Sequence, residues 1–291
     1  MKDALDGVVV AGHGRHYLVR LDDGHLLPCF PRGKKSALAC GDRVRVERSA
    51  RDQGVVVETA ARSSLLYRSD AFRKKLLAAN VTQAIVVVAT EPGFSDELIS
   101  RCLAAAEDQG IRGLIVLNKV DLAQRLATAR GQLSPFARAG HAVIEMSAHA
   151  GTAVLAPWLQ GQTSILVGQS GMGKSTLVNA LVPDAGAATR EISTALDSGR
   201  HTTTDSRLYR LDRESFLIDS PGLQVFGLAH IDIAALEHAF REFRPHLGRC
   251  RFRDCRHDRE PGCALRAAVE QGTVDARRLD HFHAIRAELA R

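Results

Sequence analysis

Hydrophobic residues in the first part of the chain recur in short alternating runs separated by turn residues, a pattern typical of β-strands. The five expected strands cover residues 7–11, 16–21, 25–29, 42–47 and 54–58. The pattern predicts a small RNA-binding β-barrel over residues 1–62. An OB-fold is our leading interpretation because such barrels commonly bind oligonucleotides. From the pattern alone, an SH3-like barrel fits nearly as well.

Residues 63–75 read as a basic linker, after which apolar strands alternate with helical stretches. This alternation predicts an α/β fold with a mostly parallel sheet over residues 63–228. Residues 229–291 are expected to form a helical domain around a group of cysteines. The expected strands of the sheet cover residues 84–89, 114–117, 143–145, 164–167 and 215–218, and its helices cover residues 96–108, 123–139 and 174–181.

Composition and charge narrow the class of protein. Of the 291 residues, 45% are hydrophobic and 25% are charged, as in a globular protein. No apolar run approaches the ~18 residues that span a bilayer, and Met1 is not followed by an apolar leader, so we expect a cytoplasmic protein without membrane contact. Net charge is +6 over residues 1–75, −4 over 76–240 and +4 over 241–291. Basic flanks favour a polyanionic partner such as nucleic acid, although scattered solvated charge explains them equally well.

A glycine-rich segment lies between an apolar strand and a helix and fits the phosphate-loop pattern G-x-x-x-x-G-K-[ST]. Its glycines allow the backbone N–H groups to surround phosphate oxygens at a helix N-terminus. Lys174 is expected to reach the β- and γ-phosphates, and the Ser175 hydroxyl to bind Mg²⁺. The alternative is a strand-to-helix turn without a ligand. The expected nucleotide-binding residues are Gly168, Gln169, Ser170, Gly171, Met172, Gly173, Lys174, Ser175 and Thr176.

The base is indicated by a second motif, Asn118-Lys119-Val120-Asp121, directly after an expected strand. Guanine presents two adjacent donors that one carboxylate, here Asp121, can accept together, whereas adenine has no such pair. Buried acceptors left unpaired by the wrong base make such a site selective, which disfavours an ATPase. Asn118 is expected to orient the loop and the Lys119 stem to lie along the purine. Ser147 and Ala148, after the strand at 143–145, are expected to support guanine from the other side.

Two further segments carry chemistry expected near the γ-phosphate. Asp219 follows the strand at 215–218 and is expected to hold Mg²⁺ through water, while the Gly222 N–H senses the γ-phosphate. The threonine-rich stretch at 199–204 is a candidate switch that binds Mg²⁺ only while the γ-phosphate is present. Thr203 is our choice as the Mg²⁺ ligand, with Thr204 a close alternative.

Three cysteines and a histidine near the C-terminus have the spacing C-x₄-C-x-H-x₅-C. Cys₃His is a closed tetrahedral set for one structural Zn²⁺, so no catalysis by zinc is expected. The alternative is three free cysteines in a small core. His281 and His283 follow on the next expected helix and are interpreted as surface residues. The expected ligands are Cys250, Cys255, His257 and Cys263, and the arginines around them, which would face RNA phosphates, are Arg249, Arg251, Arg253, Arg256 and Arg259.

The motif set resembles that of the translation-factor-related GTPases, in which the phosphate loop precedes the base-recognition motifs. Here the motif at Asn118 comes before Gly168, so the order is circularly permuted, with residues 148–161 as the join. Together with an N-terminal barrel and a C-terminal metal cluster, this order resembles the ribosome small-subunit-dependent GTPase A family over nearly the whole chain. Its specific stretches are 80–81, 118–122, 168–179, 189–193, 199–204, 219–222 and the cysteine cluster.

The resemblance implies a GTP hydrolase that acts late in small-subunit maturation, binds the small ribosomal subunit near its decoding region and is stimulated by it. Leu223 occupies the position of the water-orienting Gln of Ras-like proteins and cannot orient water. The resemblance points instead to His201, with a solvated loop residue as the alternative. Lys174, Thr203 and His201 are thus the expected catalytic residues. We expect a monomer that uses GTP and GDP and binds rRNA but not DNA.

Two other functions remain open from the sequence. The first is a GTPase that acts in translation or on another structured RNA. The second is a nucleic-acid-binding module with a vestigial nucleotide site, which the complete set of phosphate and Mg²⁺ residues disfavours. The short connection from Gly222 to the C-terminal region also suggests that GTP favours the subunit-bound arrangement and GDP favours release.

Overall fold

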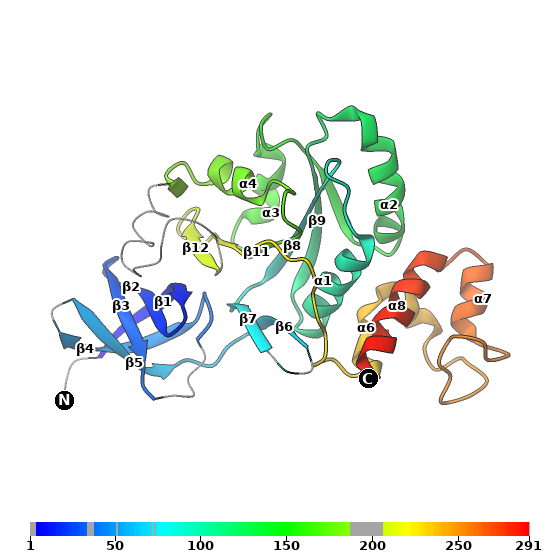
Figure 1. Cartoon of the computed structure of the whole chain (residues 1–291), viewed down its shortest axis with the longest axis horizontal. Helices are drawn as coiled ribbons and strands as arrows, with labels where there is room; N and C mark the ends of the chain where they lie inside the picture. Colours follow the sequence, from blue (N-terminus) through cyan, green and yellow to red (C-terminus); the bar gives the residue numbers. More distant parts are fainter. Residues whose placement is uncertain are drawn as a thin grey trace.

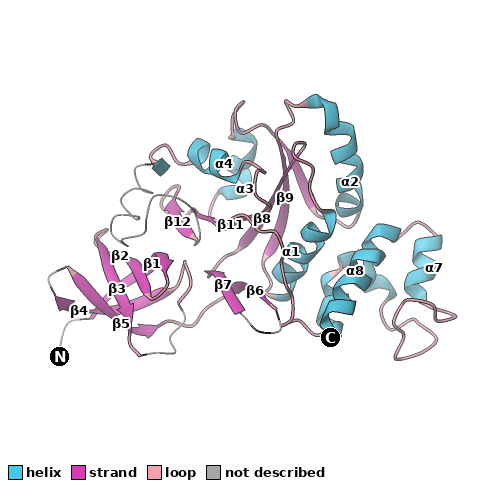
Figure 2. Ribbon diagram, viewed as in Figure 1, coloured by secondary structure: helices cyan, strands magenta, loops and turns pink. Residues whose placement is uncertain are grey.

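The computed structural model describes residues 4–33, 38–50, 52–70, 72, 74–186 and 206–290. These residues form an N-terminal barrel, a central sheet with helices on both faces, and a C-terminal group of helices (Figure 1). Figure 2 shows that strands dominate the N-terminal end of the molecule and helices the C-terminal end. Among the helices of these residues, none has the length and apolar character that crossing a lipid bilayer requires.

The barrel closes because its first strand pairs with two neighbours. Its strands are β1 (Ala4–His13), β2 (His16–Leu21), β3 (Leu26–Pro31), β4 (Arg43–Ala50) and β5 (Gln53–Thr59). They pair in the order β1-β2-β3-β5-β4, and β1 pairs with β4 as well. Val9, Val19 and Val46, each 0% exposed, belong to a core of the barrel's own. The closed, OB-like barrel confirms the predicted one, and each expected strand has a counterpart.

The stretch expected to be a linker contains most of a β-hairpin. Strand β6 (Leu65–Ser69) pairs with β7 (Lys74–Ala79) in antiparallel register. Leu66 and Leu77 are each 1% exposed and anchor the hairpin on the central core. The Lys74 ammonium lies 3.6 Å from the centroid of the Tyr67 ring. The many basic residues of this stretch concealed the alternating apolar pattern of its strands.

The central sheet is mostly parallel, as predicted. Its strands are β8 (Gln83–Ala89), β9 (Arg112–Asn118), β10 (Ala142–Glu145), β11 (Thr163–Val167), β12 (Arg207–Arg210) and β13 (Phe216–Asp219). They pair in the order β10-β9-β8-β11-β13-β12, and only β12 is antiparallel to its neighbour in this order. A bridge between Ala11 and Arg207 makes the barrel continuous with this sheet. Strand β12 was not predicted because its four residues include an arginine at each end.

Helices cover both faces of the central sheet (Figure 1). Helices α1 (Asp96–Asp108) and α2 (Leu126–Arg138) lie on one face, and α3 (Ala156–Leu159) and α4 (Lys174–Leu181) lie on the other. Helix α1 begins where predicted because the Ser95 side chain accepts a hydrogen bond from the Leu98 N–H. Helix α2 starts later than expected because residues Ala123–Arg125 form a 3₁₀ turn.

The C-terminal helices pack on α1 through buried charge. They are α6 (Ile233–Ala239), the 3₁₀ helix η3 (Arg241–His246), α7 (Ala264–Glu270) and α8 (Ala276–Leu289). Arg278 is 2% exposed and pairs with Glu242 at 2.5 Å. Its guanidinium also donates to the Ser100 hydroxyl of α1 and lies between the rings of Phe136 and Phe240. The bonded guanidinium joins α8 to the central domain.

Candidate nucleotide and metal sites

The phosphate loop connects the carboxyl end of β11 to the first turn of α4. Gly173 has a φ of 87°, and a Cβ atom there would lie 2.4 Å from the Asn118 Nδ2 atom. Only glycine fits this backbone and this close approach. Lys174 is 7% exposed, and its ammonium donates to the carbonyl oxygens of Gly168 and Gln169 at 2.8 Å each. Burial lowers the Lys174 pKa. Ser175 is exposed in the first turn, where its hydroxyl can reach a metal ion.

The base-recognition loop lies directly against the phosphate loop. Asn118, at the end of β9, is 1% exposed; its amide donates to the Met172 carbonyl at 3.1 Å and accepts from the Ala148 N–H at 3.0 Å. The Lys119 ammonium donates to the carbonyl oxygens of Gly171 and Glu91 at 2.8 Å each. Segments that are far apart in the sequence therefore converge at one edge of the sheet, where nucleotides bind in α/β folds.

Asp121 completes this edge as an exposed acceptor. The nearby Ser147 hydroxyl is the largest cause that lowers the Asp121 pKa, and the charges of His149 and Lys119 lower it further, so the carboxylate is ionised at neutral pH. An ionised carboxylate can accept both guanine donors at once. Asn118, Asp121, Ser147 and Ala148 thus occupy positions that suit the predicted guanine contacts.

Asp219 and Gly222 lie on the other side of the phosphate loop. Asp219 is 7% exposed, and its Oδ1 atom has no hydrogen-bond partner among the described residues. Burial raises the Asp219 pKa to about 6, while the nearby Lys174 charge lowers it. A Cβ atom at Gly222 would lie 3.1 Å from the Ser170 Cα atom, so this segment touches the loop. The orphaned carboxylate oxygen beside Lys174 fits a metal-bound water.

Leu223, at the sequence position of the water-orienting Gln of Ras-like proteins, has a buried apolar side chain. It is 1% exposed and packs in the core, while its N–H donates to the Gly168 carbonyl at 3.0 Å. His201, Thr203 and Thr204, together with residues 189–193, lie outside the described residues.

The arrangement agrees with comparisons to known proteins. A sequence model of the RsgA GTPase family matches residues 59–229. The chain belongs to this family. It is therefore a GTPase, a hydrolase that uses a guanine nucleotide and Mg²⁺, with the circularly permuted order predicted above.

Relatives cover nearly the whole chain. Proteins named small ribosomal subunit biogenesis GTPase RsgA include one from Nitrosospira multiformis, 53% identical over 98% of this chain and 91% of the relative. Another, from Paraburkholderia phytofirmans, is 55% identical over 98% of this chain and 92% of the relative. The crystal structure of YjeQ from Thermotoga maritima is similar with a TM-score of 0.73 and 28% identity over 99% of both chains. YloQ, described as a circularly permuted GTPase, gives a TM-score of 0.70 and 25% identity over 99% of this chain and 96% of that one.

The four predicted metal ligands lie together in the C-terminal region. The ligand atoms of Cys250, Cys255, His257 and Cys263 all lie within 4.8 Å of one another. The His257 Nδ1 atom is 3.5 Å from the Cys250 sulfur and 3.4 Å from the Cys263 sulfur. Three sulfurs and one imidazole nitrogen at these separations fit one tetrahedral ion such as Zn²⁺.

The groups around this cluster orient its histidine. The His257 Nε2 atom lies 3.4 Å from a Glu237 carboxylate oxygen, an arrangement that fixes the ring and its tautomer. His283 contacts the His257 carbonyl oxygen at 3.0 Å, while the His281 ring contacts Ser100 at 2.8 Å. His281 and His283 lie outside the cluster of four ligand residues, and both are half-buried against neighbouring elements.

Sequence reasoning missed several supporting residues. The Thr90 hydroxyl donates to the Lys119 carbonyl at 2.8 Å and supports a backbone with a φ of 59°. The Glu91 carbonyl oxygen accepts a hydrogen bond from the Lys119 ammonium. The Glu237 carboxylate contacts the His257 ring. Thr90 and Glu91 follow β8, the strand beside β9, so their position at the same carboxyl edge was a usable signal. Glu237 precedes the cluster on a separate helix and gave no such signal.

Proposed function

We propose that this GTPase acts in the biogenesis of the small ribosomal subunit, binding the subunit and its rRNA as a monomer in the cytoplasm and hydrolysing GTP faster when bound. The observation that carries the proposal is the 53–55% identity to proteins named for that process over nearly the whole chain. The likeness includes the barrel and the C-terminal region as well as the nucleotide domain. A role shared only through a GTPase domain would not require both flanks.

The described geometry supports the proposed nucleotide roles. Lys174 stabilises charge on the β- and γ-phosphates, because its ammonium lies buried within the phosphate loop. Asp121 selects guanine, and Asn118 holds the base loop against the phosphate loop. Ser175 and Asp219 would hold Mg²⁺, the second through water. The metal ion, when bound, neutralises charge on the phosphate oxygens during transfer.

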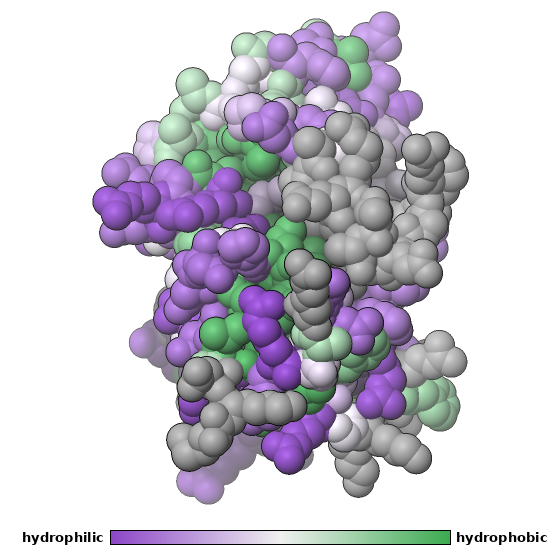
Figure 3. Space-filling model, turned by 90° about the vertical axis from the view of Figure 1, so that its left-hand side faces the viewer, coloured by the Kyte–Doolittle hydropathy of each residue, from purple (hydrophilic) through white to green (hydrophobic). Residues whose placement is uncertain are grey.

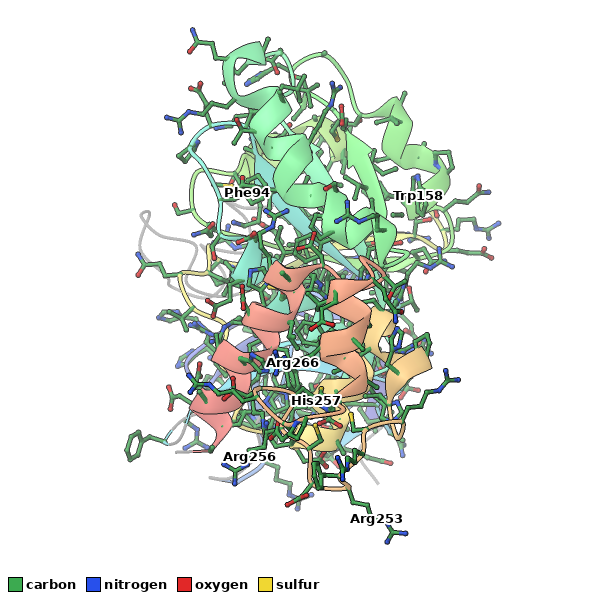
Figure 4. The ribbon with its side chains drawn as sticks, turned by 90° about the vertical axis from the view of Figure 1, so that its right-hand side faces the viewer. Phe94, Trp158, Arg253, Arg256, His257 and Arg266 are labelled. Carbon is green, nitrogen blue, oxygen red and sulfur yellow. The ribbon has the colours of Figure 1, made fainter. Side chains whose placement is uncertain are left out.

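The C-terminal cluster would hold one structural Zn²⁺ and thereby fix a basic loop. Arg253 and Arg256 project from the lower end of the molecule, while His257 lies inward beside the helices (Figure 4). All five arginines near the ligands are exposed: Arg249, Arg251, Arg253, Arg256 and Arg259. Exposed guanidiniums on a loop held by metal suit contact with RNA phosphates.

The remaining proposed roles concern residues outside the described part of the chain. His201 would orient the attacking water, since Leu223 is packed in the core. Thr203 would bind Mg²⁺ while the γ-phosphate is present. If His201→Ala leaves subunit-stimulated turnover unchanged, His201 has no part in the reaction.

The direct test is GTP hydrolysis by the purified protein with and without purified small subunits, with large subunits as the matched control. We expect small subunits, but not large subunits, to raise the kcat of GTP hydrolysis. Excess ATP should not compete with labelled GTP. Equal GTP turnover by the protein alone, with small subunits and with large subunits would instead support the alternative, a GTPase that acts in translation or on another structured RNA. In that case the affinity for unrelated structured RNA should equal the affinity for the small subunit. Equal affinity of the GTP-analogue and GDP forms for the subunit would contradict nucleotide-controlled release.

A further inference from the structure

A groove begins at the junction between the barrel and the central sheet and continues onto the barrel surface, where barrel residues alone line its largest cavity. Three adjoining cavities of about 310, 450 and 530 Å³ share wall residues along the groove. The 310 Å³ cavity is the middle one. It shares Arg20, Leu208 and Arg210 with the 450 Å³ cavity, and it shares Asp22 and Arg43 with the 530 Å³ cavity. Figure 3 shows apolar residues exposed among hydrophilic ones on the face of the molecule that looks to the left in Figure 1. Cavities of this size at a domain junction are typical ligand sites.

This groove is separate from the nucleotide loops. Thr163 begins β11 and Phe216 begins β13, and both residues line the middle cavity. Because the phosphate loop and Asp219 lie at the carboxyl ends of these same strands, the groove occupies the opposite edge of the sheet. A ligand there would not compete with GTP.

The middle cavity has an excess of basic side chains, while the acids Asp6, Glu58 and Asp184 line the two adjoining cavities. Four arginines line the middle cavity, two from the barrel and two from the central domain, against a single acid, Asp22. Arg43 and Arg213 are exposed, and neither side chain makes a hydrogen bond or ion pair with another described residue. They face the cavity from opposite domains. The exposed guanidiniums of Arg43 and Arg213, one on each wall, favour a ligand with more than one negative charge. The four arginines are Arg20, Arg43, Arg210 and Arg213.

The floor of the groove is apolar and partly aromatic. Val8 and Leu208 line the middle cavity together with the half-buried ring of Phe216. The neighbouring cavity adds the exposed ring of His25, whereas Tyr209 at its base is only 4% exposed. An apolar floor with rings accepts the flat faces of nucleobases, while arginines on the walls accept phosphates.

We propose that this groove binds a single-stranded RNA segment, with unpaired bases on the apolar floor and phosphates at Arg43 and Arg213. The proposal rests on the proposed function, which gives the protein an RNA-rich partner. A duplex does not fit this chemistry, because its bases are stacked and paired and cannot reach the floor. An acidic peptide would use the arginines but not the aromatic floor.

The test is binding of a labelled, unstructured oligoribonucleotide to the full chain by fluorescence anisotropy over a range of salt concentrations. Arg43→Glu and Arg213→Glu should each weaken binding about tenfold and lower the salt slope by about one. Arg112→Glu is the matched control, since Arg112 is exposed at the amino end of β9, outside the groove. The control should bind like the unaltered protein, and basal GTP hydrolysis should be unchanged in all three variants.

A second readout locates the RNA on the protein. Photocrosslinking with a 4-thiouridine oligoribonucleotide should label peptides that contain His25 or Phe216, and duplex RNA should not compete. Crosslinks confined to residues 249–259, or equal binding by the groove and control variants, would overturn the proposal. Displacement of the labelled oligoribonucleotide by free UMP or by an acidic peptide, but not by unlabelled single-stranded RNA, would also overturn the proposal.

The outcome is distinguishable from failure of the proposed function. Subunit-stimulated hydrolysis that survives in the unaltered protein while groove variants bind RNA normally removes only the groove. Absence of stimulation in the unaltered protein removes the proposed function, whatever the oligonucleotide result.

Discussion

The nucleotide loops and the metal cluster are built in opposite ways. The nucleotide edge brings together separate segments near residues 90, 118, 148, 168 and 219, which only the folded sheet places side by side. The metal ligands lie within residues 250–263 and depend on local spacing. The first site therefore needs tertiary structure to exist, while the proposed Zn²⁺ would hold the segment of the second site in place. The two sites should fail differently when one contact is removed.

The largest effect should come from loss of a metal ligand. Cys255→Ser should remove the bound Zn²⁺ and lower the free energy of unfolding of the C-terminal region by several kcal/mol, because metal binding supplies much of the stability of small metal-held segments. Metal content by mass spectrometry and helix content by circular dichroism measure this. The control is Cys102→Ser, a buried cysteine of α1 that is not a ligand, and it should keep its metal.

Trp158, the sole tryptophan, gives a separate probe because it lies on α3 in the central domain, away from His257 (Figure 4). Its fluorescence transition and the affinity for GTP should change little in Cys255→Ser, since distant sites act independently. Loss of GTP binding together with the metal would show that the two regions are one cooperative unit.

The next effect tests whether the nucleotide edge depends on mutual contact. Gly173→Ala should place a methyl group 2.4 Å from the Asn118 amide and force a non-glycine residue to a φ of 87°. The altered loop should relax away from this geometry in the free protein. Restoring the geometry on GTP binding should then cost about 3 kcal/mol of binding free energy, which corresponds to about a 100-fold loss of GTP affinity. The matched control is Gly131→Ala, where nothing lies within 4 Å of the added atom. Calorimetric GTP affinity within about threefold of the unaltered protein would contradict the packed geometry.

A third, smaller effect concerns Asp219, where a substitution should raise the free energy of unfolding instead of lowering it. The Asp219 pKa is raised to about 6 by burial, so the folded chain binds this proton more tightly than the unfolded chain does. Protonation of Asp219 therefore favours the folded state. This contribution to the free energy of unfolding is fully present below the pKa that Asp219 has in the unfolded chain, and it is lost as pH rises through about 6. Asp219→Asn should therefore stabilise the nucleotide-free protein by about 2 kcal/mol at pH 8, and by almost nothing at pH 4.

Chemical denaturation at the two pH values, with a chelator present, measures this difference. The same variant should lose Mg²⁺-dependent GTP hydrolysis, because an amide is a poorer partner for metal-bound water. A variant that is less stable at pH 8 than the unaltered protein would show that the carboxylate has a stabilising partner in the apo state.

What the sequence reveals about each region follows from the same contrast. Helix bounds at 96–108 and 174–181 were predictable because a capping serine and a phosphate loop mark their starts. The ligand spacing of the metal cluster was equally readable. The convergence of Asn118 with Met172 was not visible from spacing, since it depends on which strands are neighbours. The same holds for Glu237, which reaches His257 from a helix that precedes the cluster.

Two structural elements escaped prediction for a different reason. The hairpin β6–β7 has its apolar residues Leu66 and Leu77 among many basic side chains, and β12 is only four residues long. Both gain their strand structure from tertiary pairing rather than from a strong local pattern. Local pattern therefore accounts for elements that are long or capped, and neighbouring elements determine the rest.

The smallest expected effect concerns the oriented histidine of the metal cluster. Glu237→Gln keeps the shape of the side chain but removes the charge that lies 3.4 Å from the His257 ring nitrogen. Metal affinity should fall about tenfold while the four ligands remain in place, as is common when such a supporting carboxylate is lost. Competition with a fluorescent zinc chelator measures the affinity, and Glu270→Gln, on an exposed position of α7, is the control. Equal affinities of the two variants would mean that local spacing alone defines the cluster, and that it needs no support from the helix that leads to the nucleotide domain.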